Sequence, residues 1–218
     1  MSKRNAPDVQ TFGCRLNIWE SEVVRDQAGA AGLSDAIIFN TCAVTAEAEK
    51  QARQAIRKAR RDHPDAKIIV TGCAAQIAPE TWAAMPEVTQ VVGNHDKLQA
   101  ASWTKLAAND APSLLVSDVM EVHETASHMV DSFHEHTRAF LQVQQGCDHR
   151  CTFCIIPYGR GNNRSAPASN LIDAARRLVA NGCKELVLTG VDITSWGNDL
   201  PGRPRLGNLV RQILDAVQ

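Results

Sequence analysis

Short runs of apolar and β-branched residues alternate with helical patterns through the first hundred positions of the chain. The runs typical of strands lie at residues 8–12, 36–40, 67–71 and 89–92. After the first run, Asn17 is an expected helix N-cap, apolar residues recur at helical spacing from Trp19 to Ala31, and Gly32 ends the pattern. A second helix is expected to begin after Thr45. Strands that alternate with helices predict an α/β domain with a doubly wound parallel sheet at residues 1–106.

Three cysteines occupy equivalent positions in this pattern, each in the loop after a predicted strand. Cys14 follows the first strand, Cys42 the second and Cys73 the third, and we call these three the amino-terminal triad. Ligands bind such sheets beyond the carboxyl ends of the strands, so we expect the three thiols to meet at one edge. A free cysteine by itself is usually a small buried hydrophobe. Three at equivalent positions, each beside a small or turn residue, favour a shared metal cluster.

The periodicity is lost between residues 107 and 136. This segment gathers Pro112, acidic residues and four histidines: His123, His128, His134 and His136. Histidine-rich tracts can bind metal, but these spacings fit no particular site, so a solvated linker is the favoured interpretation. One short strand is expected within it, near residues 114–116.

A second α/β unit is predicted over residues 137–218. Its strands and helices are expected in alternation at residues 138–144, 169–181, 185–189 and 206–217. They resemble the first two βα units of a partial TIM barrel. A barrel cannot close with two strands, because the remaining edges would lack partners. The sequence therefore predicts an incomplete barrel in a chain truncated at its carboxyl end.

Composition places the chain among ordinary globular proteins. It has 218 residues, of which 44% are hydrophobic, enough for buried cores. We find no apolar stretch of signal-peptide or bilayer-spanning length, so we expect a cytoplasmic location and no membrane partner. Seven cysteines without an export signal indicate a reducing compartment, in which thiols stay available for metals. The formal net charge of -1 gives no global signal for nucleic acid, so RNA binding must depend on local patches.

Three further cysteines are close together in the second unit. Cys147, Cys151 and Cys154, the carboxyl-terminal triad, lie within eight residues. Thiolates this close can turn toward one metal centre, and three of them leave one iron of a four-iron cluster open. The alternative is a zinc site with Cys183 or His149 as the fourth ligand. Zinc sites usually present cysteines as spaced pairs, so an iron–sulfur cluster is favoured, and a disulfide is favoured least.

The spacing of the carboxyl-terminal triad, with Phe153 directly before its last cysteine, resembles the signature of the radical S-adenosylmethionine (SAM) enzymes. With both triads in view, the chain resembles the tRNA methylthiotransferases over nearly its whole length. The matching motifs lie at residues 12–17, 40–44, 71–74, 92–94 and 160–165. Residues 188–197 are similar to the branch that acts on N6-threonylcarbamoyladenosine, although Trp196 stands where tyrosine is expected. The isopentenyladenosine branch usually has Gly-Gln-Asn in place of Gly190-Val191-Asp192.

The resemblance implies two [4Fe-4S] clusters and SAM as cofactors. The cluster on the carboxyl-terminal triad would bind SAM by its amino and carboxylate groups and cleave it to a 5'-deoxyadenosyl radical. Phe153 would pack near the adenine, and Gly190, Val191 and Asp192 would meet the amino acid end of SAM. The cluster on the amino-terminal triad would supply the sulfur. No catalytic residue beyond the cluster ligands is implied.

The implied activity is that of a transferase of sulfur-containing groups, which adds a methylthio group to carbon 2 of N6-threonylcarbamoyladenosine at position 37 of tRNA. That carbon carries no acidic proton, so a radical is needed, and the base must leave its stack in the anticodon loop. An electron donor such as flavodoxin or ferredoxin is an implied partner, and a monomer is expected.

Two sets of basic residues are candidates for contact with RNA. Arg160 and Arg164 lie close to the reactive loop and are the better candidates. The other set is explained equally well as the solvated face of a helix: Arg53, Arg57, Lys58, Arg60 and Arg61.

Three other functions stay open at this point. They are methylthiolation of isopentenyladenosine tRNA, methylthiolation of a ribosomal protein aspartate, and a non-enzymatic iron–sulfur or zinc-binding module. A zinc protein would be colourless, and an electron carrier would be brown but inert toward SAM.

Overall fold

A five-stranded parallel sheet forms the centre of the amino-terminal unit in the computed structural model, which describes residues 7–123 and 138–217. The strands lie side by side in chain order: β1 (Asp8–Thr11), β2 (Ala36–Thr41), β3 (Lys67–Gly72), β4 (Gln90–Val92) and β5 (Leu114–Leu115). The first four agree with the predicted strands to within one residue at each end. The strand expected near residues 114–116 is β5, so the sheet continues past residue 106. His128, His134 and His136 lie outside the described residues.

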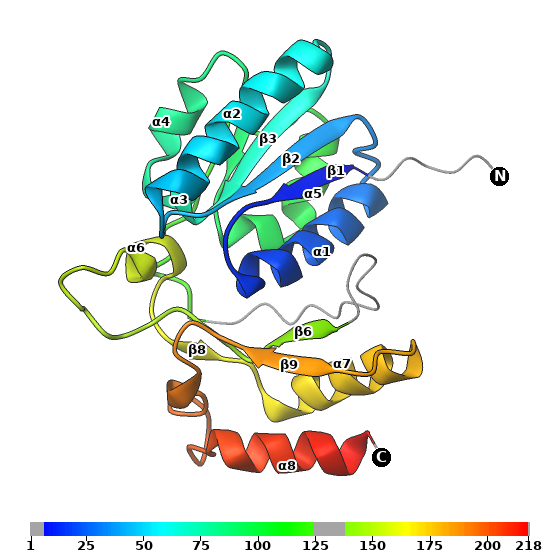
Figure 1. The fold of residues 1–218 in the computed structure, drawn as a ribbon, viewed down its shortest axis with the longest axis vertical. Helices are drawn as coiled ribbons and strands as arrows, with labels where there is room; N and C mark the ends of the chain where they lie inside the picture. Colours follow the sequence, from blue (N-terminus) through cyan, green and yellow to red (C-terminus); the bar gives the residue numbers. More distant parts are fainter. Residues whose placement is uncertain (1–6, 124–137, 218) are drawn as a thin grey trace.

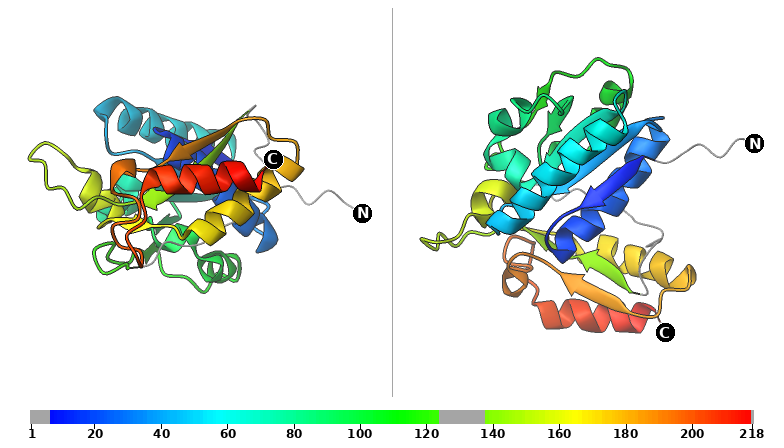
Figure 2. Two further views of the ribbon diagram at one scale, coloured as in Figure 1. Left: turned by 90° about the horizontal axis from the view of Figure 1, so that it is seen from below. Right: turned by 45° about the horizontal axis from the view of Figure 1, so that its top comes forward.

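Helices cover both faces of this sheet, which confirms the predicted α/β architecture (Figures 1 and 2). One face carries α1 (Arg15–Ala30) and α5 (Ala100–Ala107), and the other carries α2 (Ala46–Asp62) and α4 (Pro79–Ala83). Val24 of α1 packs with Trp103 on the first face, whereas Ile56 packs with Phe39 and Trp82 on the second. Two short elements complete the unit: α3 (Cys73–Ile77) and the 3-10 turn η1 (Asp96–Leu98).

The start of α1 differs from the prediction. Its N-cap is Cys14, and Asn17, the predicted cap, lies inside the first turn. The Asn17 side chain is fully buried and donates to the carbonyls of Phe12 at 2.6 Å and Thr41 at 3.0 Å. The oxygen that would cap a helix, Asn17 Oδ1, accepts a hydrogen bond from Arg160 Nη2 at 2.6 Å instead, so tertiary contacts occupy this side chain. The predicted start of the second helix is confirmed, because Thr45 is its N-cap and Thr45 Oγ1 accepts a hydrogen bond from the Ala48 amide at 3.2 Å.

The carboxyl-terminal unit has a smaller sheet. Strands β6 (Ala139–Gln142) and β9 (Leu186–Thr189) pair in parallel, and helices α7 (Ala168–Ala180) and α8 (Leu206–Ala216) share a core with them. The predicted strand at residues 138–144 ends earlier, and a separate antiparallel pair forms between β7 (Gln144–Gln145) and β8 (Arg164–Ser165). These two-residue strands contain no apolar alternation, which is why the pattern gave no signal for them. The remaining elements are α6 (Ile156–Arg160) and the 3-10 turn η2 (Ile193–Ser195).

The two units meet along α1 and α6 (Figure 1). Trp19 and Val23 of α1 pack with Leu98 and with Phe140 of β6. Helix α6 reaches from the carboxyl-terminal unit to α3, where a Cβ atom on Gly159 would lie 3.1 Å from the Cβ of Cys73. The helix that follows one cysteine triad thus touches a member of the other.

Candidate functional site

The amino-terminal triad surrounds one cavity at the carboxyl edge of the five-stranded sheet. Cys14 caps α1, Cys42 follows β2, and Cys73 is the first residue of α3. All three line a cavity of about 580 Å³. They meet at one edge, as the strand pattern predicts.

Two glycines allow the loops of this site to approach each other closely. The φ angle of Gly13 is +101°, and a Cβ atom on it would lie 2.5 Å from the Cβ and 2.7 Å from the Sγ of Cys42. Gly72 has a φ of +99°, and its Cβ would lie 2.2 Å from the carbonyl oxygen of Thr41. A larger residue at either position would displace the loop that carries Cys42.

Two of these sulfurs lie near N–H donors. The Val44 amide is 3.4 Å from Cys42 Sγ, and Asn94 Nδ2 is 3.5 Å from Cys73 Sγ. Burial raises the pKa of the Cys42 thiol, the Val44 amide lowers it, and the neighbouring thiolates of Cys73 and Cys14 raise it further. Donors of this kind suit sulfurs that are thiolates when they ligate a metal.

The carboxyl-terminal triad lies on the loop between β7 and α6. The amide of Cys147 donates to the carbonyl of Gly161, and the amide of Cys154 donates to that of Cys151, both at 3.0 Å. Cys151 is exposed and the other two are half-buried. Phe153, predicted to contact the adenine of SAM, is 90% exposed beside them.

The carboxyl end of β9 lies between the triads. Thr189, Gly190 and Val191 line the cavity of the amino-terminal triad. The next residue, Asp192, places its carboxylate 3.2 Å from Nε2 of His149, which belongs to the loop of the carboxyl-terminal triad. The predicted SAM-binding segment is therefore in contact with both sites.

Hydrogen bonds fix Asp192 in this position. Ser195 Oγ donates to it at 2.6 Å and Thr194 Oγ1 at 2.7 Å. The Ser195 bond is the main cause that lowers the pKa of Asp192, with burial opposing it. The Asp192 carboxylate is also one of the charges that, after burial, raise the pKa of Cys147.

The walls of the cavity suit an anionic iron–sulfur cluster. Among the described residues that line it, the charged ones are Arg15 and Arg160, and apolar side chains such as Leu16, Ile18 and Ile77 make up most of the rest. Iron bound by thiolates carries negative charge, which two arginines complement in an apolar setting. Over residues 7–123 and 138–217, no three histidine, cysteine or acidic side chains stand at the spacing of a preformed metal site. The donor set fits the cluster in chemistry and in charge.

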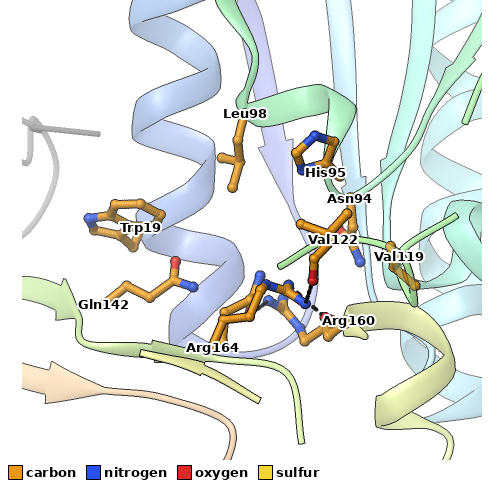
Figure 3. Close-up of a pocket in the computed structure, with 10 residues that line it drawn as sticks. Trp19, Asn94, His95, Leu98, Val119, Val122, Gln142, Arg160 and Arg164 are labelled. Carbon is orange, nitrogen blue, oxygen red and sulfur yellow. Dashed lines mark hydrogen bonds between the residues drawn. The ribbon is translucent and has the colours of Figure 1, made fainter. Parts of the chain in front are cut away.

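The prediction that Arg160 and Arg164 contact RNA is wrong, because both side chains are buried. They are 3% and 7% exposed and line a small interior cavity of about 20 Å³ between the two units (Figure 3). Arg164 donates to the carbonyl oxygens of Arg160 at 2.9 Å and Asn162 at 3.0 Å. Their guanidinium groups are occupied by the protein itself.

Two of the five basic residues of α2, Arg53 and Arg60, make contacts within the protein, whereas Arg57, Lys58 and Arg61 are exposed. Arg53 pairs with Glu49 at 2.7 Å and stacks on Trp82 at 4.3 Å. Arg60 donates to the backbone carbonyls of Glu87 at 2.8 Å and Pro64 at 2.6 Å. These contacts favour a structural role for Arg53 and Arg60.

The alternative zinc ligands do not complete the carboxyl-terminal triad. Cys183 lies after α7, at the amino end of β9, and its thiol donates to the carbonyl of Glu185 at 3.2 Å. The triad lies beyond the opposite end of that strand. His149 faces Asp192. Zinc coordination by these extra ligands is not supported.

A buried ionic network between the two units was not predicted. Glu20 of α1 is fully buried and accepts hydrogen bonds from Lys97 Nζ at 2.7 Å and Arg160 Nη1 at 2.7 Å. The available sequence signal was a glutamate within the apolar stripe of α1, between Trp19 and Val23. Its partner is 140 positions away, so the pattern alone could not identify it.

The described helices include none that is long and apolar enough to cross a membrane.

Two family profiles match the chain. Residues 7–93 match the "Uncharacterized protein family UPF0004", and residues 141–213 match the "Radical SAM superfamily". The two cysteine triads fall one in each matched region.

Curated relatives match nearly the whole chain. The threonylcarbamoyladenosine tRNA methylthiotransferase MtaB of Rickettsia prowazekii (strain Madrid E) is 51% identical over 96% of this chain and 49% of the relative. The protein of the same name from Bacillus subtilis (strain 168) is 38% identical over 87% of this chain and 44% of the relative. The tRNA-2-methylthio-N(6)-dimethylallyladenosine synthase of Roseiflexus sp. (strain RS-1) is 31% identical over 95% and 44%. The chain spans about half the length of the curated relatives it matches.

Proposed function

This chain belongs to the radical SAM methylthiotransferase family, and on that premise we propose that its protein adds a methylthio group to carbon 2 of N6-threonylcarbamoyladenosine at position 37 of tRNA. One observation carries the proposal. The amino-terminal triad and the carboxyl end of β9 line the same cavity, so a sulfur source and a SAM-binding segment would face each other. Proximity of this kind is what transfer between two cofactor sites requires.

The six cysteines of the two triads are the proposed ligands of two [4Fe-4S] clusters. Bound there, the clusters and SAM would supply the radical and the sulfur that the reaction needs. Asp192 orients the loop of the carboxyl-terminal triad through His149, and Gln144 Oε1 fixes Asp192 by accepting its amide at 2.8 Å. Gly190 and Val191 line the cavity, and Phe153 is exposed for contact with SAM.

The substrate assignment rests on the branch named for threonylcarbamoyladenosine, to which the 51% and 38% identical relatives belong. A carboxylate-bearing modification needs donors or a cation in its pocket, whereas a prenyl group needs apolar walls. A tRNA anticodon loop, a flavodoxin or ferredoxin as electron donor, a monomeric state and a cytoplasmic location are the other parts of the proposal.

Iron analysis tests the two sites. Anaerobic reconstitution of the full-length protein should give two four-iron clusters per chain, and changing Cys147, Cys151 and Cys154 together to alanine should halve the iron. Loss of all iron in this triple variant, or zinc in the purified protein, would refute the two-cluster assignment.

Nucleoside analysis tests the substrate. Offered both modified tRNAs, the full-length protein should add the methylthio group to the threonylcarbamoyl form, as detected by mass spectrometry of digested nucleosides. Preferential modification of the isopentenyl form would refute the substrate and leave the radical chemistry standing. Cleavage of SAM without modification of either tRNA would favour a different acceptor, such as the ribosomal protein aspartate.

A further inference from the structure

The carboxyl-terminal unit contributes one charged residue to the cavity of the amino-terminal triad. Arg160, the last residue of α6, lines that cavity together with Cys14 and Cys73. It stands six positions after Cys154 in the sequence. The residue is 3% exposed, so its charge is not screened by solvent.

The orientation of Arg160 is fixed by four hydrogen bonds. Nη1 donates to Oε1 of Glu20 at 2.7 Å, and Nη2 donates to Oε2 at 3.1 Å. The same two nitrogens donate to Gln145 Oε1 at 2.8 Å and to Asn17 Oδ1 at 2.6 Å. Asn17 Oδ1 also lies 3.9 Å from Cys14 Sγ, which connects this network to the triad. A bidentate guanidinium with every partner buried is a rigid arrangement.

The network contains an excess of positive charge. Among the described residues, Glu20 is the carboxylate that pairs with both cations, Lys97 and Arg160, so the three groups sum to one positive charge. Glu20 and Lys97 are fully buried. Burial lowers the pKa of Lys97, and the carboxylate of Glu20 opposes that shift. A buried charge without compensation is unfavourable, so an anion beside Arg160 would stabilise this network.

The amino-terminal triad is the group that would supply this anion, because Cys14 and Cys73 line the same cavity as Arg160. Burial opposes the charge of Arg160, but the thiolate of Cys73 and the carboxylate of Glu20 outweigh burial and hold the pKa of Arg160 well above its usual value. Cys14 acts in the same direction. An iron–sulfur cluster on this triad would be the anion beside the surplus charge.

We propose that Arg160 is the charge partner of the amino-terminal cluster, so that its position in the Glu20 network sets the reduction potential of that cluster. The inference rests on the proposed function, because it requires a cluster on Cys14, Cys42 and Cys73. A cation near a cluster stabilises the reduced, more negative form and raises the potential, and an anion lowers it. Since Arg160 belongs to the other unit, the potential depends on how α6 is docked.

Redox titration followed by electron paramagnetic resonance tests this. The parent is the full-length protein with the carboxyl-terminal triad changed to alanine, which isolates the amino-terminal cluster. Arg160→Met should lower the potential, with roughly tenfold less reduced cluster at a fixed ambient potential, equivalent to about 59 mV for one electron. Arg160→Lys should retain most of the parent potential. Arg176→Met, at an exposed arginine of α7 paired with Asp173, is the matched control and should change nothing.

A variant of opposite sign separates charge from disruption. Glu20→Gln removes the negative member of the network and should raise the potential. Shifts of Arg160→Met and Glu20→Gln in the same direction, or no shift in either, would overturn the inference. If Arg160→Met does not retain iron, Glu20→Gln decides: a rise supports the inference, and no change or a fall refutes it. Absence of iron from the parent would refute the proposed amino-terminal cluster itself, a result distinct from a bound cluster whose potential does not move.

Discussion

Replacing Gly13 by alanine should remove the iron of the amino-terminal triad and leave that of the carboxyl-terminal triad in place. The new Cβ would lie 2.5 Å from Cys42 Cβ and 2.7 Å from its Sγ, so Cys42 must shift from the position that it shares with the other two thiols. Cys42 is only 4% exposed, so such a shift must also displace its neighbours. Iron per chain should therefore fall by half after anaerobic reconstitution of the full-length protein.

The effect on stability has two parts. The φ of +101° strains any residue with a Cβ, by about 1–3 kcal/mol. The overlap with Cys42 adds about 1–3 kcal/mol of overpacking. Gly32→Ala is the matched control, because its φ is +87° but nothing lies within 4 Å of the new Cβ. It should show the strain alone.

Urea denaturation of the metal-free proteins gives the free energy of unfolding by linear extrapolation. Gly13→Ala should be less stable than Gly32→Ala by about 1–3 kcal/mol, the overpacking part. Gly32→Ala should keep full iron. Equal losses of stability in the two variants, or full iron in Gly13→Ala, would refute the view that Gly13 makes room for a cluster ligand.

Three further predictions concern the interface and the SAM segment. Although burial alone would raise the pKa of Glu20, Arg160 and Lys97 hold it at about 2, below its ordinary 4.5. The ionised Glu20 carboxylate therefore stabilises the fold by about 3 kcal/mol; this stabilisation is complete above pH 4.5 and is lost as the pH falls toward 2. In an acid titration of the metal-free protein, Glu20→Gln should lack this loss of stability. Gln144→Ala leaves the buried carbonyl of Gly146 and the amide of Asp192 without their partner, so urea denaturation should show a loss of about 1–3 kcal/mol and 5'-deoxyadenosine release should fall; unchanged values would contradict its bridging role. Phe153→Ala should change stability by less than about 0.5 kcal/mol, since the ring is 90% exposed, but should weaken SAM affinity in equilibrium binding; equal affinity would remove Phe153 from the SAM site.

The sequence contained enough information for the sheet and for the meeting of three cysteines. Buried parallel strands appear in the sequence as continuous apolar runs, and the loops that follow them all lie at the carboxyl edge of the sheet. Cys14, Cys42 and Cys73 could therefore be placed at one edge from strand positions alone.

Long-range polar contacts could not be predicted in the same way. Asn17 has the residue type of a helix cap, yet its side chain donates hydrogen bonds to the carbonyls of Phe12 and Thr41. Arg160 and Arg164 have the charge of an RNA contact, yet both are buried. A side chain's partner depends on packing between segments far apart in sequence, which periodicity does not encode. The pair of strands β7 and β8 was missed because a two-residue strand is too short to show a period of apolar residues.

Helix α1 has two apolar sides, and this limits how the protein can be recombined. Val24 faces its own sheet, whereas Trp19 and Val23 face Phe140 of β6. A hybrid that joins the first unit of one relative to the second unit of another would divide this shared core between two parents. Such hybrids should melt at lower temperature unless α1 and β6 come from the same parent. Selection for stability should therefore keep the two units of one parent together.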